Sequence, residues 1–199
     1  MQLNYLYFVD DSYFEKYKND TISQNQKEDE EHHRPCYYAF KEDDIYWMIP
    51  ISSRIDKYET IYDKAMQKYG MCDALAFVYV KGNKNVALLQ NMIPVTGRYI
   101  KDVYVHADSG KPIEINLNKR KEINAKARKI LRFARQGKKL TFTPILDFEK
   151  RLKEELHSDK HKDTFGCLIF MPFNKTIAPN QGAILIRNMY RNFNGLHIA

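Results

Sequence analysis

The fold is decided by the stretch CYYAFKEDDIYWMI, residues 36–49. Two aromatic-rich runs, 36–40 and 45–49, flank the polar and acidic residues 41–44. Aromatic and β-branched residues favour strands, and a short polar link between two such runs is typical of a β-hairpin. We therefore expect an antiparallel pair of strands here. Pro50 is expected to end the second strand, because proline has no N–H to donate.

Working outward from this hairpin, strand-like runs alternate with helical patterns. Residues 74–80 and 86–90 flank a turn at Gly82 and predict a second hairpin. This order predicts an α+β fold, a compact twisted antiparallel β-sheet core with flanking helices and two C-terminal helices. The longer helices are expected over residues 59–69, over 118–136 and from 143 onward.

The clearest helical pattern runs from Asn118, a suitable N-cap, to Gly137, which is suited to end a helix. Near the N-terminus, Ser12 is likewise expected to cap a short helix. The apolar residues of the long helix recur at helical spacing and form one stripe, made by Ile123, Ala127, Ile130, Leu131 and Ala134.

The positive charge of the chain is concentrated in residues 118–139. This segment has ten Lys and Arg against the single acid Glu122, so it carries +9, more than the +7 of the whole chain. Such a concentration attracts polyanions, of which nucleic acid is the commonest in a cell, although an ordinary solvated helix face gives the same pattern. The predicted RNA-binding residues are Lys121, Arg128, Lys129, Arg132, Arg135, Lys138 and Lys139.

Several protein classes are disfavoured by the sequence. No apolar run approaches the roughly 18 residues of a membrane span, and the N-terminus has no basic region before an apolar one, so we expect a cytoplasmic protein. Three widely spaced cysteines suggest neither a disulfide framework nor a zinc site. Nucleotide-binding glycine motifs are missing, which disfavours a doubly wound nucleotide-binding fold.

A second informative stretch is YWMIPISSRIDK, residues 46–57. It places two hydroxyls and two cations directly after a strand, where side chains have a rigid base and still reach solvent. Ser52, Ser53, Arg54 and Lys57 are therefore candidate ligands of a phosphate, whose negative charge they would stabilise. A turn with ordinary surface charges is the alternative reading.

The strand paired with this one begins next to Arg34 and His33. In a hairpin, the start of the first strand lies near the end of the second, so we expect both residues near Ser53. Histidine titrates near neutrality and can act as general acid or base. Together these residues suit RNA cleavage by attack of the ribose 2′-hydroxyl on the adjacent phosphate, a reaction that requires no bound metal.

Three sequence blocks resemble the endoribonuclease toxins of type III toxin–antitoxin and abortive-infection systems, the ToxN/AbiQ family, which includes CptN. RPCYY at residues 34–38 is similar to the family segment in which a basic residue opens the second strand. YWMIPISSR at 46–54 and LLQNMIPV at 88–95 are similar to two further family blocks, and the spacing between the blocks agrees. The likeness covers roughly residues 3–156.

This resemblance implies a metal-independent endoribonuclease toxin of antiviral defence and growth arrest, with no cofactor, which leaves 2′,3′-cyclic phosphate ends on its RNA substrate. It also implies a partner, a small structured antitoxin RNA made from a repeat array. The toxin processes this RNA and retains it in a closed assembly. Position by position, Ser53 matches the central hydroxyl of the family, Ser52 the residue before it, and Arg34 the basic residue of the first block.

The chain departs from the family after the second hydroxyl, where Pro and then Lys are common. Here Arg54 and Ile55 follow, so we expect the cation to come from Arg54 or Lys57. The family's acid or base is a tyrosine or histidine upstream of the first block, and His33 is the candidate.

For the domain organisation, we expect residues 1–157 to form the ribonuclease domain and residues 158–199 an extension of unknown role. The alternative function is a non-catalytic RNA- or DNA-binding module that uses the basic helix over residues 118–137.

Overall fold

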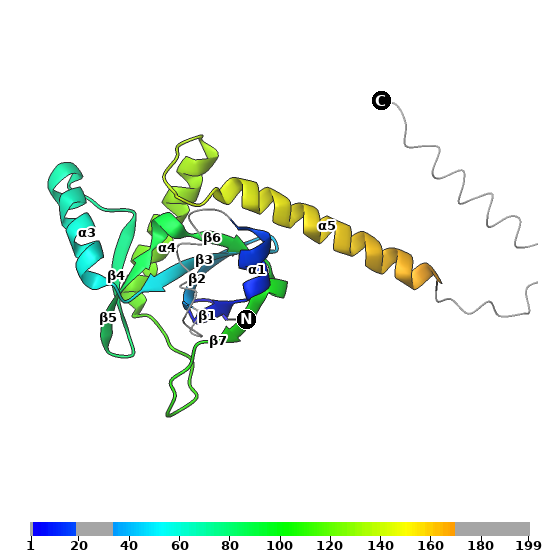
Figure 1. The fold of residues 1–199 in the computed structure, drawn as a ribbon, viewed down its shortest axis with the longest axis horizontal. Helices are drawn as coiled ribbons and strands as arrows, with labels where there is room; N and C mark the ends of the chain where they lie inside the picture. The colour runs from blue at the N-terminus through cyan, green and yellow to red at the C-terminus, as the bar shows by residue number, and fades with distance from the viewer. Residues whose placement is uncertain (1, 19–33, 170–199) are drawn as a thin grey trace, which may run out of the picture. The chain divides into compact units, whose positions relative to one another are not determined.

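The computed structural model of this 199-residue chain describes residues 2–18 and 34–169, with side chains as far as residue 159. Within these residues, seven antiparallel strands form one sheet in the order β4-β5-β3-β2-β1-β7, and β6 pairs with β3 off this path (Figure 1). The predicted α+β fold with an antiparallel sheet is confirmed. The strands are β1 (Leu6–Val9), β2 (Cys36–Glu42), β3 (Ile45–Ser52), β4 (Leu75–Val80), β5 (Asn83–Leu88), β6 (Ile93–Val95) and β7 (Ile100–Val103).

Helices flank the sheet, and the two predicted C-terminal helices are present as α4 and α5. The contacts divide the chain into two units, Met1–Leu156 and His157–Ala199, and the residues discussed below belong to the first. Residues 170–199, most of the predicted extension, lie outside the described residues. The helices are α1 (Asp11–Lys16), α3 (Ile55–Tyr69), α4 (Leu117–Arg135) and α5 (Ile145–Ile169), with single 3-10 turns η1 (Leu89–Asn91) and η2 (Gly97–Tyr99).

The first predicted hairpin is confirmed, but Pro50 does not end its second strand. β3 continues to Ser52, because Ile51 donates its N–H to the carbonyl of Pro35 at 2.9 Å and the next residues pair with β5. Successive N–H groups of a strand point to opposite sides, so the missing N–H of Pro50 faces away from β2. On the side away from β2, β3 pairs with β6 up to Met48 and with β5 from Ile51. Pro50 lies between these two paired segments, so no partner strand requires its N–H.

Two of the predicted helix caps are wrong by two residues. The side chain of Asp10, rather than Ser12, caps α1 by accepting from the N–H of Ser12 at 2.9 Å. The side chain of Asn116, rather than Asn118, caps α4 in the same way, at 3.0 Å. In both cases the predicted cap is the residue whose N–H the true cap binds. The predicted apolar stripe of α4 is buried in full.

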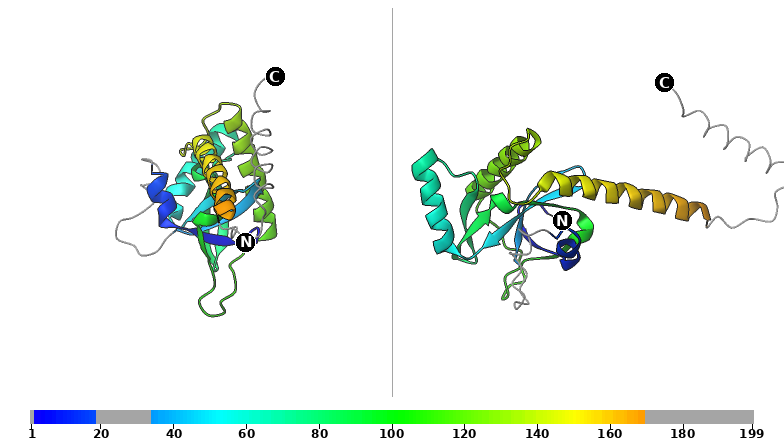
Figure 2. Two further views of the ribbon diagram at one scale, coloured as in Figure 1. Left: turned by 90° about the vertical axis from the view of Figure 1, so that its right-hand side faces the viewer. Right: turned by 45° about the horizontal axis from the view of Figure 1, so that its top comes forward.

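α3 and α4 cover opposite faces of the sheet at its β4–β5 end. Alternate residues of these strands point to opposite faces, and Leu75 and Val86 belong to a small core with α3. Ala76 and Ala87, one position along each strand, belong instead to the main core, which includes the stripe of α4. Figure 1 and the right-hand view of Figure 2 show α3 beside β4 and β5. The two helices therefore present their outer surfaces on different sides of the molecule.

Candidate functional site

The candidate site is built where β3 ends and α3 begins. β3 ends at Ser52 and α3 starts at Ile55, so Ser53 and Arg54 form the whole connection. The N–H of Ile55 donates to the carbonyl of Ser53 at 2.9 Å, which turns the chain directly into the helix. Among the described residues, no side chain caps this helix end. The unsatisfied N–H groups and the dipole of a helix N-terminus favour an anion there.

The two predicted hydroxyls differ in access to solvent. The Ser52 side chain is buried, with the residue 3 % exposed, and its Oγ accepts from the N–H of Arg54 at 3.3 Å. Ser52 pairs with Val86, so it faces the small core under α3. Ser53 is exposed. Ser53 is therefore the hydroxyl that a ligand can reach, whereas Ser52 holds the connection in place.

The structure brings Arg34 to the same end of the sheet. The hydrogen bond from Ile51 to Pro35 continues the register of β2 and β3 beyond the first residue of β2. One step further, Arg34 lies opposite Ser52. Residues directly opposite each other in an antiparallel pair share a face of the sheet. By this register, Arg34 lies on the face to which Ser52 belongs, and it is half-buried there.

Cys36 lies next to Arg34 on this face. Burial raises the pKa of its thiol to about 12, and the guanidinium of Arg34 opposes this rise only in part. The Sγ atom donates weakly to the carbonyl of Arg34, at 3.8 Å. Since the thiolate is the reactive form of cysteine, this thiol is no nucleophile at neutral pH. The chemistry of this end of the sheet thus falls to hydroxyls and cations.

Lys57 is exposed in the first turn of α3, three residues after Arg54, and its Nζ lies 5.6 Å from the ring centre of Tyr58. The helix begins at Ile55, whereas the sequence predicted a start at residue 59. The missed signal is the helical spacing of the residues that pack on the small core, Ile55, Tyr58, Tyr62 and Ala65.

The predicted acid or base, His33, lies outside the described residues. A tyrosine upstream of the first block that shares the face of Arg34 is Tyr7, because it pairs with Cys36. Its hydroxyl donates to the carbonyl of Gln2 at 3.0 Å and accepts from the N–H of Gln2 at 2.9 Å. Tyr7 is thus near the predicted site but already hydrogen-bonded to the backbone.

The predicted RNA-binding cations divide into paired and unpaired groups. Lys129 pairs with Asp73 at 2.5 Å, and Arg135 pairs with Glu42 at 2.7 Å and Glu149 at 3.1 Å. These carboxylates come from distant parts of the chain, so the +9 of the segment overstates its field. Four of the predicted cations have no carboxylate within 4 Å among the described residues, namely Lys121, Arg132, Lys138 and Lys139.

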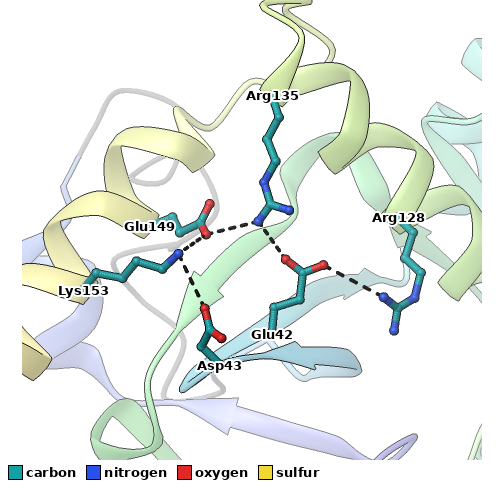
Figure 3. Close-up of polar contacts among 6 residues, drawn as sticks. All are labelled: Glu42, Asp43, Arg128, Arg135, Glu149 and Lys153. Carbon is teal, nitrogen blue, oxygen red and sulfur yellow. Dashed lines mark hydrogen bonds and ion pairs between the residues drawn. The ribbon is translucent and has the colours of Figure 1, made fainter.

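Figure 3 shows the charge cluster in which Arg135 takes part. Glu42, the last residue of β2, lies between Arg135 and Arg128. A guanidinium nitrogen of Arg128 is 3.9 Å from Oε1 of Glu42. Lys153 of α5 extends the cluster, since its Nζ lies 2.8 Å from Glu149 and 3.8 Å from Asp43. The cluster joins the β2–β3 turn, α4 and α5 by alternating charges.

Neither a scan against protein-family models nor a search of curated proteins gives a match for this chain. Within the described residues, no three His, Cys, Asp or Glu side chains gather as a metal ion would require. None of the described helices combines the length and the apolar character needed to cross a membrane.

Proposed function

We propose that this chain is a metal-independent endoribonuclease toxin of the ToxN/AbiQ type that acts in the cytoplasm. The observation that carries the proposal is the junction of β3 and α3, where the exposed hydroxyl of Ser53, Arg54 and a helix N-terminus lie together, with Arg34 just before the neighbouring strand β2. These groups suit one phosphate, because they donate to its oxygens and favour its charge.

The reaction proceeds by attack of a ribose 2′-oxygen on the adjacent phosphorus, while a base takes the 2′-hydroxyl proton. The bond from phosphorus to the 5′-oxygen of the next nucleotide breaks, and an acid protonates that oxygen. The products are a 2′,3′-cyclic phosphate and a 5′-hydroxyl. Ser53, Arg34 and Arg54 donate to the non-bridging oxygens, whose negative charge grows in the transition state. Tyr7 and His33 are the candidates for proton transfer.

In this proposal, the predicted cations over residues 121–139 that have no ion pair among the described residues bind the phosphates of a second RNA, the structured antitoxin. Structured RNA is recognised by its backbone, its shape and its unpaired bases more than through its deep major groove. An exposed basic helix face with free Lys and Arg side chains suits such contacts. To keep the toxin inactive, this RNA would also have to extend from α4 to cover Ser53.

The test is induced expression of wild type, Ser53→Ala and Ser109→Ala in a bacterial host. Ser109 is an exposed serine in the turn before Gly110, and its variant is the matched control. We expect wild type and Ser109→Ala to arrest growth and to yield RNA fragments with 2′,3′-cyclic phosphate ends. Ser53→Ala should allow growth at equal protein level, because the transition state loses a donor, at a cost of about 10²-fold or more in rate.

Intact RNA and normal growth with wild type would overturn the proposal. The second candidate, a nucleic-acid-binding module that uses α4, predicts this result together with salt-sensitive RNA binding that Ser53→Ala leaves unchanged. Abolition of cleavage by EDTA would instead indicate a metal-dependent nuclease.

A further inference from the structure

An open surface pocket of about 340 Å³ lies beside the charge cluster of Figure 3. Its volume lies within the range of small-ligand sites, about 300–1,000 Å³. The pocket is distinct from the Ser53 site, because Glu42 is at the turn of the β2–β3 hairpin and Ser53 follows the opposite end of β3. We call it the arginine pocket, and it is lined by Glu42, Arg128, Leu131, Arg132, Arg135 and Gln136.

The charged hydrogen-bond acceptor in the lining of the arginine pocket is the carboxylate of Glu42, whose side chain is 32 % exposed. Arg135 donates to its Oε2 at 2.7 Å, and Arg128 lies 3.9 Å from its Oε1. A carboxylate can accept at about four positions. Glu42 is thus hydrogen-bonded by Arg135, lies beside the guanidinium of Arg128 and keeps capacity for further donors from a ligand.

Arg132 and Arg128 supply the complementary features. Arg132 is exposed and has no carboxylate within 4 Å among the described residues, so its guanidinium is available to an acceptor. The guanidinium of Arg128 lies 4.3 Å from the ring centre of Phe40, and its side chain is 57 % exposed. One side of this planar group therefore meets a buried aromatic ring, and the other can stack on a nucleobase.

We propose that the arginine pocket binds an unpaired guanine base of RNA. This inference rests on the proposed function only in taking RNA as the ligand. Guanine offers two adjacent donors, N1–H and N2–H, to the Glu42 carboxylate, and its O6 and N7 atoms are the acceptors that arginine prefers. Adenine and cytosine would turn a ring-nitrogen lone pair toward the carboxylate, and uracil offers a single N–H between two carbonyls. Guanine alone matches both the acceptor and the donors.

The test uses 2′-O-methyl oligouridylates, which attack by a 2′-hydroxyl cannot cleave, with one central guanosine, adenosine or inosine. Binding is measured by fluorescence anisotropy. We expect guanosine to bind about tenfold more tightly than adenosine. Inosine should bind less tightly than guanosine, because it lacks the N2 amino group. Glu42→Gln should lose the preference for guanosine, and Arg132→Gln should weaken guanosine binding.

Asp108→Asn is the matched control, since it makes the same change of carboxylate to amide at an exposed turn residue outside the pocket. It should keep the full preference for guanosine. Equal binding of guanosine and adenosine by wild type, or an unchanged preference in folded Glu42→Gln, would overturn the inference. A wild type that fails to cleave RNA yet prefers guanosine would refute the proposed function and leave this inference standing.

Discussion

At the scale of the residue, the neighbouring hydroxyls of Ser52 and Ser53 have different tasks because the strand ends between them. Ser52 is the last residue of β3 and turns its side chain into the small core beneath α3, where it accepts from the N–H of Arg54. Ser53 is released from the sheet and reaches solvent. In the proposed reaction, Ser52 is a positioning residue and Ser53 touches the phosphate.

The Cys36 thiol gives a prediction about pH dependence. Burial raises its pKa from an ordinary value of 9.0 to about 12, so it stays protonated through the neutral range. At pH 8 its thiolate fraction is on the order of a thousandfold below that of an unperturbed thiol. We expect iodoacetamide to leave Cys36 unmodified in the folded protein and to modify it after denaturation, as measured by peptide mass spectrometry. Rapid modification in the folded protein at neutral pH would contradict the structure.

The sequence predicted where the candidate residues lie along the chain better than it predicted their surroundings. A strand followed by two serines and Arg54 is visible in a short window, as is Arg34 at the start of the paired strand. The burial of Ser52 is not visible in that window, because it depends on pairing with Val86, a residue of the distant strand β5. Tyr7, a candidate for proton transfer in the proposed function, was likewise beyond a local pattern, since it reaches this face only through the pairing of β1 with β2.

At the scale of the element, local patterns placed helices and strands well and their ends less well. The apolar stripe of α4 was readable because it repeats within one helix, and all of it is buried. The caps were misplaced because several polar residues adjoin each helix start, and only the backbone angles decide which one accepts. β3 continues past Pro50 because the proline lies between the segments that pair with β6 and with β5. This arrangement of partner strands is a property of the whole sheet.

The first unit is also held together by a carboxylate of α5. Glu155 accepts from the hydroxyl of Tyr17, from the hydroxyl of Tyr99 at 2.8 Å, and pairs with Lys16 at 2.8 Å. Burial alone would raise the pKa of Glu155, but these three donors outweigh it and lower the pKa below the ordinary 4.5. The contacts tie α5 to α1 and η2.

From this network we predict a pH-dependent stability. A lowered pKa in the folded state stabilises the fold above the ordinary pKa, and this contribution is lost as the pH falls through the lowered value. Glu155→Gln should reduce the free energy of unfolding by about 1–3 kcal/mol at pH 7. The difference from wild type should shrink below about pH 4.5, as measured by urea denaturation. The exposed neighbour substitution Glu15→Gln on α1 should change little, and an effect of equal size would contradict this role.

At the scale of the whole molecule, folding redistributes the charge that the sequence concentrates. Carboxylates from residue 42, residue 73 and residue 149 reach α4 and neutralise part of its charge. A count along a sequence window cannot include them, because ion pairs join segments far apart in the chain. What remains positive is a smaller set of side chains at the helix surface and in the segment that follows it.

The salt dependence of RNA binding distinguishes the cations near α4 that are paired with a carboxylate from those that have none among the described residues. Each phosphate neutralised by a free cation releases counterions, so loss of one such contact lowers the slope of log affinity against log salt by about 1. Lys139 is exposed and has no ion pair with any residue that the structure describes, so we expect Lys139→Gln to reduce the slope for a 2′-O-methyl oligouridylate. Lys129→Gln should change it less, because Lys129 is already paired with Asp73. Equal changes would show that the ion pair opens on binding.

β3 is bordered by β2 along one side and by β6 and β5 along the other. Backbone amides held in this way exchange with solvent only when a large part of the sheet opens together, whereas edge strands such as β4 and β7 open more often. The Ser53 hydroxyl directly follows the last residue of this central strand. We therefore expect the position of Ser53 to be kept through local openings of the edge strands, and to be lost only when the inner strands of the sheet open.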